Sequence, residues 1–295
     1  MDQATRLRAM VQKKEPQEMN NARVIAVTSG KGGVGKTSLS VNLAIQLSRM
    51  GKRVVIFDAD FGLANVEVML GIRPQHTLLD LIHNNMTISQ IITQGPNGIG
   101  FISGGSGVSE LASLDNTSIK LLISELVKLD SMYDIVIIDT GAGITDSVME
   151  FVMVSPEVLL VITPEPTSIT DAYSLLKVLR RKDAFNPLYK SISIVSNRVD
   201  NELEGREIYN KINTVSTKFL NTKLRYFGSV MYDKNVSSAV VAQKPVVVAF
   251  PNSMAAKGMT SLAKKLMDDQ REDYKKRDGI AKVFFDFIKF KKKQR

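Results

Sequence analysis

The chain has 295 residues, of which 44% are hydrophobic and 23% charged, so it is long enough to bury one large core or two ordinary ones. It contains no cysteine, which excludes disulfides and thiolate metal sites and agrees with a cytoplasmic protein. No apolar run is long enough to cross a bilayer, and the first residues lack the apolar centre of a secretory signal.

The charge is unevenly distributed. The formal net charge is +9, and residues 275–295 hold nine basic side chains against two acidic ones. The rest of the chain is therefore nearly neutral. A basic tail on a neutral body differs from a basic face that binds DNA, so we expect no specific nucleic-acid partner.

The first 21 residues are polar and indicate a head and linker. From residue 24 onward, apolar strand-length segments alternate with helix-length segments, and several strands are continuous Val/Ile runs of the kind that is covered on both faces. This order predicts an α/β fold, a doubly wound and mostly parallel sheet with helices on both faces, in one domain over residues 22–275. The expected strands are 24–27, 54–57, 99–102, 135–138, 158–162, 192–195 and 227–231. The expected helices are 38–49, 117–129, 146–154, 169–181, 204–220 and 254–276.

A glycine-rich segment follows the first strand candidate and precedes a helix candidate. Residues 30–37 read GKGGVGKT and match the pattern G-x-x-x-x-G-K-[ST]. At such a helix N-terminus, unpaired N–H groups and the helix dipole favour an anion, and glycine lets the backbone approach phosphate oxygens. We therefore expect a P-loop in which Lys36 reaches the β- and γ-phosphates. The expected nucleotide-binding residues are Gly30, Lys31, Gly32, Gly33, Val34, Gly35, Lys36, Thr37 and Ser38.

The same glycines also fit a dinucleotide-binding fingerprint. Gly30, Gly32 and Gly35 satisfy G-x-G-x-x-G, and Asp58 ends the second strand, where a ribose-binding acid would lie. A dinucleotide fold has no use for a Lys-Thr pair after the last glycine. Lys36 and Thr37 therefore favour the P-loop.

Acidic residues at two strand ends complete the expected site. Asp139 ends an apolar strand and, with the Thr37 hydroxyl, is the candidate ligand of Mg²⁺. Asp60 lies where a switch loop should emerge and is the candidate that orients the hydrolytic water. For Asp58, an ordinary strand-end turn is as good an interpretation as a function.

Lys31 occupies a position that a general P-loop leaves open. The string KGGVGKT at 31–37 resembles the deviant Walker A signature of the MinD/ParA class, and FDADFGLAN at 57–65 resembles its first switch. The resemblance covers nearly all of residues 22–270 and implies an ATPase with ATP/ADP and Mg²⁺ as cofactors. It further implies a nucleotide-sandwich homodimer in which Lys31 reaches the partner's phosphates. The candidate catalytic residues are then Asp60, Lys31 and Lys36.

The same resemblance assigns three further nucleotide contacts. It implies that Glu165 touches the partner's ribose and that Asn197 and Arg198 contact adenine. Adenine over guanine rests on this resemblance, since no N-K-x-D string follows the sixth strand candidate.

The head adds a second resemblance. Residues 2–8 read DQATRLR and match the D-Q-A-x-x-L-R element of FlhG, also called YlxH or FleN, a MinD-like family that regulates flagellar number and placement. That family's head docks on FlhF, a signal-recognition-type GTPase, and stimulates it. The resemblance also admits flagellar C-ring proteins as partners. The alternative is a solvated, disordered terminus. The implied partner-binding residues are Asp2, Gln3, Ala4, Leu7 and Arg8.

The tail predicts an amphipathic helix over residues 276–295. Its apolar positions follow helical spacing and precede a lysine run, which is typical of a helix in a membrane interface on the cytoplasmic side. The alternative is that the helix packs on its own domain. Both interpretations hold if an ADP-bound monomer keeps the helix docked and an ATP-bound dimer releases it. The candidate membrane-binding residues are Ile280, Val283, Phe284, Phe287, Ile288, Lys291, Lys292 and Lys293.

Two other functions remain open. One is a DNA-partitioning ATPase of the ParA type, which shares the body but binds DNA through a basic dimer surface. The other is a scaffold that binds nucleotide and docks partners, with hydrolysis incidental.

Overall fold

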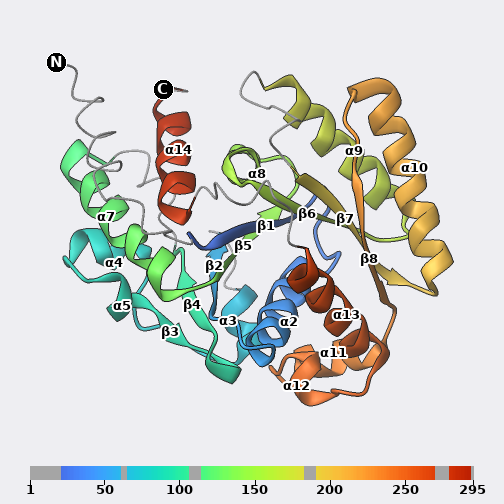
Figure 1. Ribbon diagram of the computed structural model, residues 1–295, viewed down its shortest axis with the longest axis horizontal. Coiled ribbons are helices and arrows are strands. Elements are labelled where there is room, and N and C mark those ends of the chain that lie inside the picture. Colours follow the sequence, from blue (N-terminus) through green and yellow to red (C-terminus); the bar gives the residue numbers. More distant parts are fainter. Residues whose placement is uncertain (1–20, 61–64, 106–113, 183–190, 270–278, 294–295) are drawn as a thin grey trace.

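The computed structural model describes residues 21–60, 65–105, 114–182, 191–269 and 279–293. Its centre is an eight-stranded sheet in the order β3-β4-β2-β5-β1-β6-β7-β8 (Figure 1). Every neighbouring pair is parallel except β3 and β4. The strands are β1 (Arg23–Ser29), β2 (Val54–Ala59), β3 (Thr93–Gln94), β4 (Gly100–Ser103), β5 (Ile135–Ala142), β6 (Glu157–Ile162), β7 (Ser191–Val199) and β8 (Arg225–Met231).

Helices cover both faces of the sheet (Figure 1). One face carries α2 (Lys36–Arg49), α3 (Asn65–Leu70), α11 (Lys234–Val241), α12 (Val246–Ala249) and α13 (Met254–Asp268). The other carries α4 (Leu78–His83), α5 (Ile88–Ile91), α7 (Asn116–Met132), α8 (Asp146–Val154), α9 (Pro166–Arg181), α10 (Glu202–Leu220) and α14 (Ile280–Lys293). A 3₁₀ turn, η1 (Pro96–Gly98), precedes β4.

The doubly wound α/β fold predicted from the sequence is confirmed, and all seven expected strands are present. The sequence missed β3 and five short helices, namely α3, α4, α5, α11 and α12. The expected helix 254–276 ends at Asp268, and residues 270–278 lie outside the described part of the chain, as does nearly all of the head.

The pleat of each strand separates two cores. In β2, Val54 and Ile56 belong to the core under α2 and α13, whereas Val55 and Phe57 belong to the core under α7 and α14. Successive side chains of a strand point to opposite faces, so a buried strand supplies both cores from one run of apolar residues. By the same alternation, Asp58, the residue after Phe57, points to the same face of the sheet as Val54 and Ile56.

The tail helix packs on its own domain. All five of its predicted apolar positions are at most 2% exposed. The Phe284 ring lies 4.9 Å from that of Phe57 and 5.7 Å from that of Phe151, and Phe287 stacks on Phe151 at 4.2 Å. The predicted helix is confirmed, but in this conformation its apolar face is covered by α7 and α8 and is not available to a membrane. None of the described helices is long and apolar enough to span a bilayer.

A buried ion-pair network lies at the opposite end of the sheet from the glycine-rich loop. Arg23, at the start of β1, donates to both carboxylate oxygens of Glu157, at 2.6 and 2.7 Å, and to the carbonyl of Leu266 at 2.7 Å. Arg225 pairs with Asp269, whose Oδ2 lies 3.6 Å from Arg23 Nη2. The bidentate pair joins β1 to β6, and Asp269 joins the end of α13 to β8.

We predict that Glu157→Ala destabilises the fold. The substitution leaves the Arg23 guanidinium buried without its bidentate partner, which costs about 3 kcal/mol in the free energy of unfolding. Urea unfolding at neutral pH measures the loss. The matched control is Arg206→Ala, which removes an exposed pair with Glu202 and should change stability by less than about 1 kcal/mol. Equal effects of the two substitutions would contradict the role assigned to Arg23.

Candidate nucleotide-binding site

The glycine-rich loop joins β1 to α2, and two of its glycines are required by packing. A Cβ on Gly30 would lie 2.2 Å from the backbone carbon of Asp171 in α9. Gly35 has φ +94°, and a Cβ there would lie 2.5 Å from Asn197 Nδ2. In contrast, a Cβ on Gly32 would meet nothing closer than 3.9 Å. The protein itself therefore leaves the space above Gly32 open.

Lys36 and Thr37, the first two residues of α2, meet the strand-end carboxylate of β5. The Thr37 hydroxyl donates to Asp139 Oδ2 and the Ser40 hydroxyl donates to Asp139 Oδ1, each at 2.7 Å. Asp139 is fully buried, and burial raises its pKa to about 6 although both hydroxyls and the charge of Lys36 oppose the shift. Burial also lowers the pKa of Lys36, which is 8% exposed. Sequence reasoning missed Ser40 because a serine one turn into a helix carries no motif.

These oxygens suit Mg²⁺. The ion prefers oxygen ligands, usually one or two from the protein, and completes its shell with phosphate oxygens and water. Thr37 Oγ1 and Asp139 Oδ2 are adjacent and lie at the start of α2. Among the described residues, no group of three or more acidic or histidine side chains could hold a metal alone. Thr37 and Asp139 would therefore hold the ion only together with a nucleotide.

Asp58 and Asp60 follow Phe57 at the end of β2. Asp58 Oδ1 accepts the backbone N–H of Asp60 at 2.9 Å. Burial, reinforced by the charge of Asp139, raises the pKa of Asp58 to about 8. A buried side chain that accepts the backbone N–H of Asp60 supports a structural role for Asp58.

Asp60 lies directly after β2, within the predicted first switch at residues 57–65. Its Oδ2 accepts a hydrogen bond from Asn65 Nδ2 at 3.2 Å, and its Oδ1 lies 3.5 Å from where a Cβ on Gly141 would be. Residues 61–64, between Asp60 and Asn65, lie outside the described part of the chain. The carboxylate therefore lies beside Gly141, near the C-terminal end of β5.

Lys31 points away from its own loop. Its Nζ lies 2.5 Å from Glu165 Oε2 and 2.9 Å from Thr167 Oγ1, at the start of α9. Hydrogen bonding and charge from Lys31 lower the pKa of Glu165. Both side chains are more than one-third exposed, so the pair is weak and readily exchanged for other partners.

Asn197 and Arg198, at the end of β7, adjoin the loop from the other side. Asn197 Nδ2 donates to the carbonyl of Val34 at 2.7 Å, a contact that sequence reasoning could not find. Arg198 is exposed and has φ +59°, a backbone conformation that is uncommon for a residue with a Cβ. Asn197 thus braces the loop, while Arg198 is presented to solvent at the same edge.

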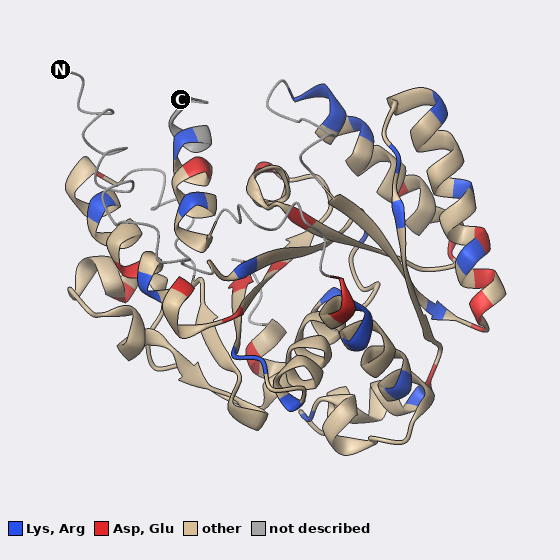
Figure 2. Ribbon diagram, viewed as in Figure 1, with Lys and Arg blue, Asp and Glu red and all other residues tan. Residues whose placement is uncertain are grey.

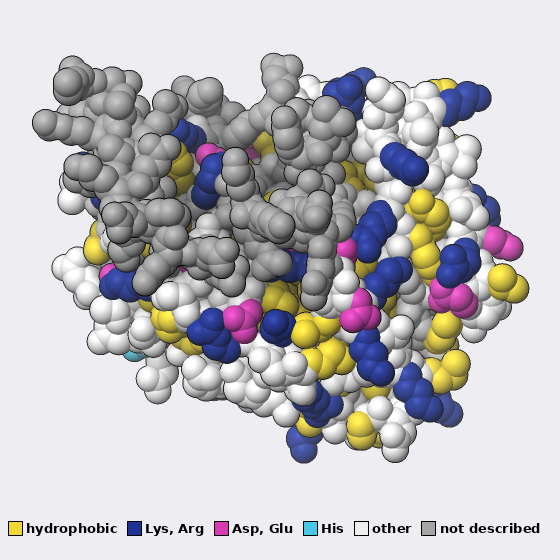
Figure 3. All heavy atoms as spheres, viewed as in Figure 1, with side chains coloured by type: hydrophobic (Ala, Val, Ile, Leu, Met, Phe, Trp, Pro, Cys, Tyr) yellow, Lys and Arg dark blue, Asp and Glu magenta, His cyan; other side chains and the backbone are white. Residues whose placement is uncertain are grey.

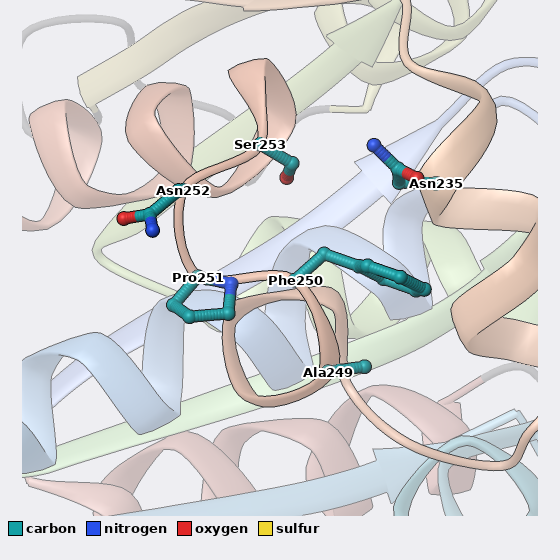
Figure 4. A pocket seen from close by; sticks show the side chains of 6 residues that line it. All are labelled: Asn235, Ala249, Phe250, Pro251, Asn252 and Ser253. Atoms are coloured by element: carbon teal, nitrogen blue, oxygen red, sulfur yellow. The ribbon is translucent and has the colours of Figure 1, made fainter.

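Two adjoining hollows near this edge were not foreseen. One, of about 410 Å³, is lined by Asn235 and by residues 249–253 between α12 and α13 (Figure 4). The other, of about 500 Å³, is lined partly by Tyr232, whose N–H donates to the carbonyl of Val199 at 2.8 Å. This second hollow therefore lies beside the turn that carries Asn197 and Arg198. Tyr232 and the next residues that line this hollow follow β8 directly in the sequence. Only the folded chain places them near the glycine-rich loop.

The structure thus gathers Lys36, Thr37, Asp139 and Asp60 around the start of α2. Lys31 and Glu165 pair with each other at the rim. The five apolar candidates of the tail helix lie on the other face of the sheet, away from this site. The side chains of the lysine run 291–293 and all five head candidates lie outside the described part of the chain.

We predict that two loop glycines respond differently to alanine. Gly30→Ala should lower the free energy of unfolding of the nucleotide-free chain by about 1–3 kcal/mol, because the new methyl overlaps the backbone of α9. Gly32→Ala should leave that stability unchanged. It should instead weaken ATP binding about tenfold or more, as expected when a methyl obstructs one hydrogen bond to phosphate. Calorimetric unfolding and nucleotide titration of both variants separate the effects, and unaltered ATP affinity in Gly32→Ala would contradict this placement of the phosphates.

Comparison with known proteins agrees with this geometry. Residues 25–246 match the model of the CobQ/CobB/MinD/ParA nucleotide binding domain. The antiactivator FleN of Pseudomonas aeruginosa is 40% identical over 86% of this chain and 89% of its own length. The flagellum site-determining protein YlxH of Helicobacter pylori is 31% identical over 89% of both chains.

A solved structure supports the fold alone. MinD from Pyrococcus horikoshii, which was solved in complex with Mg-ADP, superposes with a TM-score of 0.65 at 22% identity, covering 87% of this chain and 100% of that one.

The match to the family model and the identity with the two relatives decide the family. The chain belongs to the CobQ/CobB/MinD/ParA family of nucleotide-binding domains and, within it, to the FleN/YlxH group.

Proposed function

We propose that the chain is an ATP-hydrolysing switch that pairs with a second copy around two nucleotides and regulates flagellar placement or number. The observation that carries the first part is the contact of Thr37 and Ser40 with the buried Asp139 at the start of α2. The flagellar part rests on the names of the two relatives, an antiactivator and a flagellum site-determining protein.

Each polar group of the site has a distinct role in the proposed reaction. Lys36 and the loop N–H groups bind and orient the phosphates, and Thr37 with Asp139 would hold Mg²⁺, which offsets phosphate charge. Asp60 orients a water in line with the γ-phosphate. Asn197 keeps the loop in shape through Val34. Arg198 and the hollow that includes Tyr232 are the proposed contacts of the base.

Lys31 links the reaction to dimer formation. In the single chain its ammonium contacts Glu165 and Thr167 and not its own phosphate loop. A cation that reaches a second subunit's phosphates would stabilise charge that develops during phosphoryl transfer, as an arginine finger does. We propose that pairing frees Lys31 from Glu165 for this contact, with Glu165 then meeting the partner's ribose.

We predict that Asp60→Ala keeps ATP binding and loses hydrolysis. The carboxylate that orients water is removed, whereas the loop and the Thr37–Asp139 contact are unchanged, so kcat should fall at least about tenfold. Size-exclusion chromatography should then give an ATP-dependent dimer that persists in the variant and is absent with ADP. Lys36→Gln is the contrasting control and should lose nucleotide binding. Wild-type turnover in Asp60→Ala would show that the catalytic assignment is wrong, as the scaffold alternative requires.

We propose that formation of the ATP-bound dimer leads to membrane association. The apolar face of α14 is covered in the single chain, and its cover includes Phe57 and Phe151. Phe57 lies three residues before Asp60, and α8, which carries Phe151, begins at Asp146, shortly after β5 ends at Ala142. We propose that movement at the ends of β2 and β5 displaces Phe57 and Phe151 and so loosens α14. Release of two helices from one dimer would give bivalent binding to anionic lipid at the inner face of the cell membrane.

A DNA-partitioning ATPase of the ParA type is the alternative function for the same nucleotide-binding fold. Basic and acidic residues lie together on α10 and α13 (Figure 2), and in Figure 3 lysine and arginine side chains are interspersed with acidic and apolar ones. We predict that Asp60→Ala with ATP floats with anionic liposomes and that deletion of residues 279–295 abolishes flotation. A mobility shift on DNA that survives this deletion, with no flotation by the intact chain, would favour the ParA-type function.

The head is the proposed contact with a GTPase of the signal-recognition type. We predict that a peptide of residues 1–21 stimulates GTP hydrolysis by an FlhF-type partner, because the DQATRLR element resembles the FlhG activator. A peptide with Gln3→Ala is the matched control and should stimulate less. Phosphate release under single-turnover conditions measures the rate, and an unchanged rate with the wild-type peptide would remove this partner from the proposal.

A further inference from the structure

One carboxylate joins the two ends of the described chain. Asp130 lies in the last turn of α7, and its Oδ1 accepts the backbone N–H of Ala22 at 3.3 Å and that of Ile280 at 3.2 Å. Ala22 immediately precedes β1, and Ile280 is the first residue of α14. The three segments are more than 100 residues apart in sequence, so this junction exists only in the folded chain.

The Asp130 carboxylate is well placed to cap the N-terminus of α14. The first N–H groups of a helix lack partners within the helix, and a negative charge there is favoured by the helix dipole. The segment before α14 supplies no described cap, and α7 provides the carboxylate instead. Burial raises the pKa of Asp130 to about 6, against the effect of both N–H groups, so the carboxylate remains mostly charged at neutral pH.

Gly279 makes the approach possible. A Cβ at this position would lie 2.2 Å from Asp130 Oδ2. The residue before α14 thus lies directly against the carboxylate, and a larger residue there would displace the Asp130 side chain from its position at the start of α14. The fit is independent of the apolar face of α14, which packs through Phe284 and Phe287.

We propose that Asp130 is a latch residue that holds α14 on the body and couples this hold to the position of Ala22, and so to the head. Both donors share one oxygen, so the bond from Ala22 keeps the carboxylate in the rotamer that receives Ile280. Loss of that bond returns rotamer freedom to Asp130 and weakens the anchor of α14. A partner that pulls the head away from the body then promotes release of the tail, a consequence that rests on the proposed function of head and tail.

Hydrogen exchange of the intact ADP-bound chain tests the latch without lipid or GTPase. Asp130→Ala and Gly279→Ala should each speed exchange of the α14 amides about tenfold, the effect expected on loss of a helix cap. Exchange in β1, β5 and β6 should stay unchanged. The matched control is Asp80→Ala, which removes a carboxylate that caps α4 by accepting the Thr77 N–H and should leave α14 at the wild-type rate. Wild-type exchange of α14 in Asp130→Ala would overturn the latch.

Coupling is tested from both directions. Ala22→Pro removes the N–H donor and should speed α14 exchange several-fold in the wild-type background but not in Asp130→Ala. Phe287→Ala loosens α14 at its contact with Phe151, and by reciprocity it should speed exchange of the Ala22 amide, again only where Asp130 is present. The second arm stands if Ala22→Pro does not fold. Equal effects with and without Asp130 would overturn the coupling.

Liposome flotation of the ADP-bound variants distinguishes the latch from the membrane proposal. Faster α14 exchange with greater flotation supports both. Faster exchange without flotation supports the latch alone, and the membrane proposal is then decided by flotation of the ATP-bound Asp60→Ala dimer, in which both helices are released.

Discussion

The two-residue period of β2 and β5 is the constraint on which the rest of this structure depends. In β2, Phe57 points to the core under α14, and the next residue, Asp58, starts the polar strand end at the phosphate loop. In β5, Ile138 belongs to the core under α14, and the next residue, Asp139, meets α2. Adjacent residues thus point to opposite faces of the sheet, so residues one peptide unit apart face the candidate nucleotide site on one side and the core under α14 on the other.

In the proposed function, this arrangement would carry a change at the nucleotide to the tail without a long chain of contacts. The loops that should sense the γ-phosphate emerge directly after these strands, and their neighbours Phe57 and Phe151 form the floor on which Phe284 and Phe287 pack. A close-packed aromatic cluster tolerates little displacement. A small shift at the end of β2 or β5 therefore weakens the packing of Phe57 and Phe151 against α14. At the first residue of α14, one turn before Phe284, Asp130 holds the helix by a hydrogen bond that does not involve the rings.

The sequence predicts the parts whose signals are local. Val/Ile runs mark the parallel strands, and the glycine pattern with Lys36 and Thr37 marks the anion site, because both depend on neighbours along the chain. Short helices such as α4 and α5 are not predicted, because a segment of a few residues is too short to show helical periodicity. The contacts of Ser40, Asn197 and Asp130 join residues far apart in sequence, so no spacing rule reveals them. For α14 the spacing predicts an apolar face but not what covers it.

The proposed function requires that the nucleotide state control the docking of α14. Because the chain has no cysteine, spin labels on two introduced cysteines would be site-specific. Lys120 on α7 and Lys282 on α14 are both exposed and suit this substitution. With ADP, electron-electron distance measurement should give one short, narrow distribution, and with ATP in the Asp60→Ala background a longer and broader one. The same narrow distribution in both states would contradict the account.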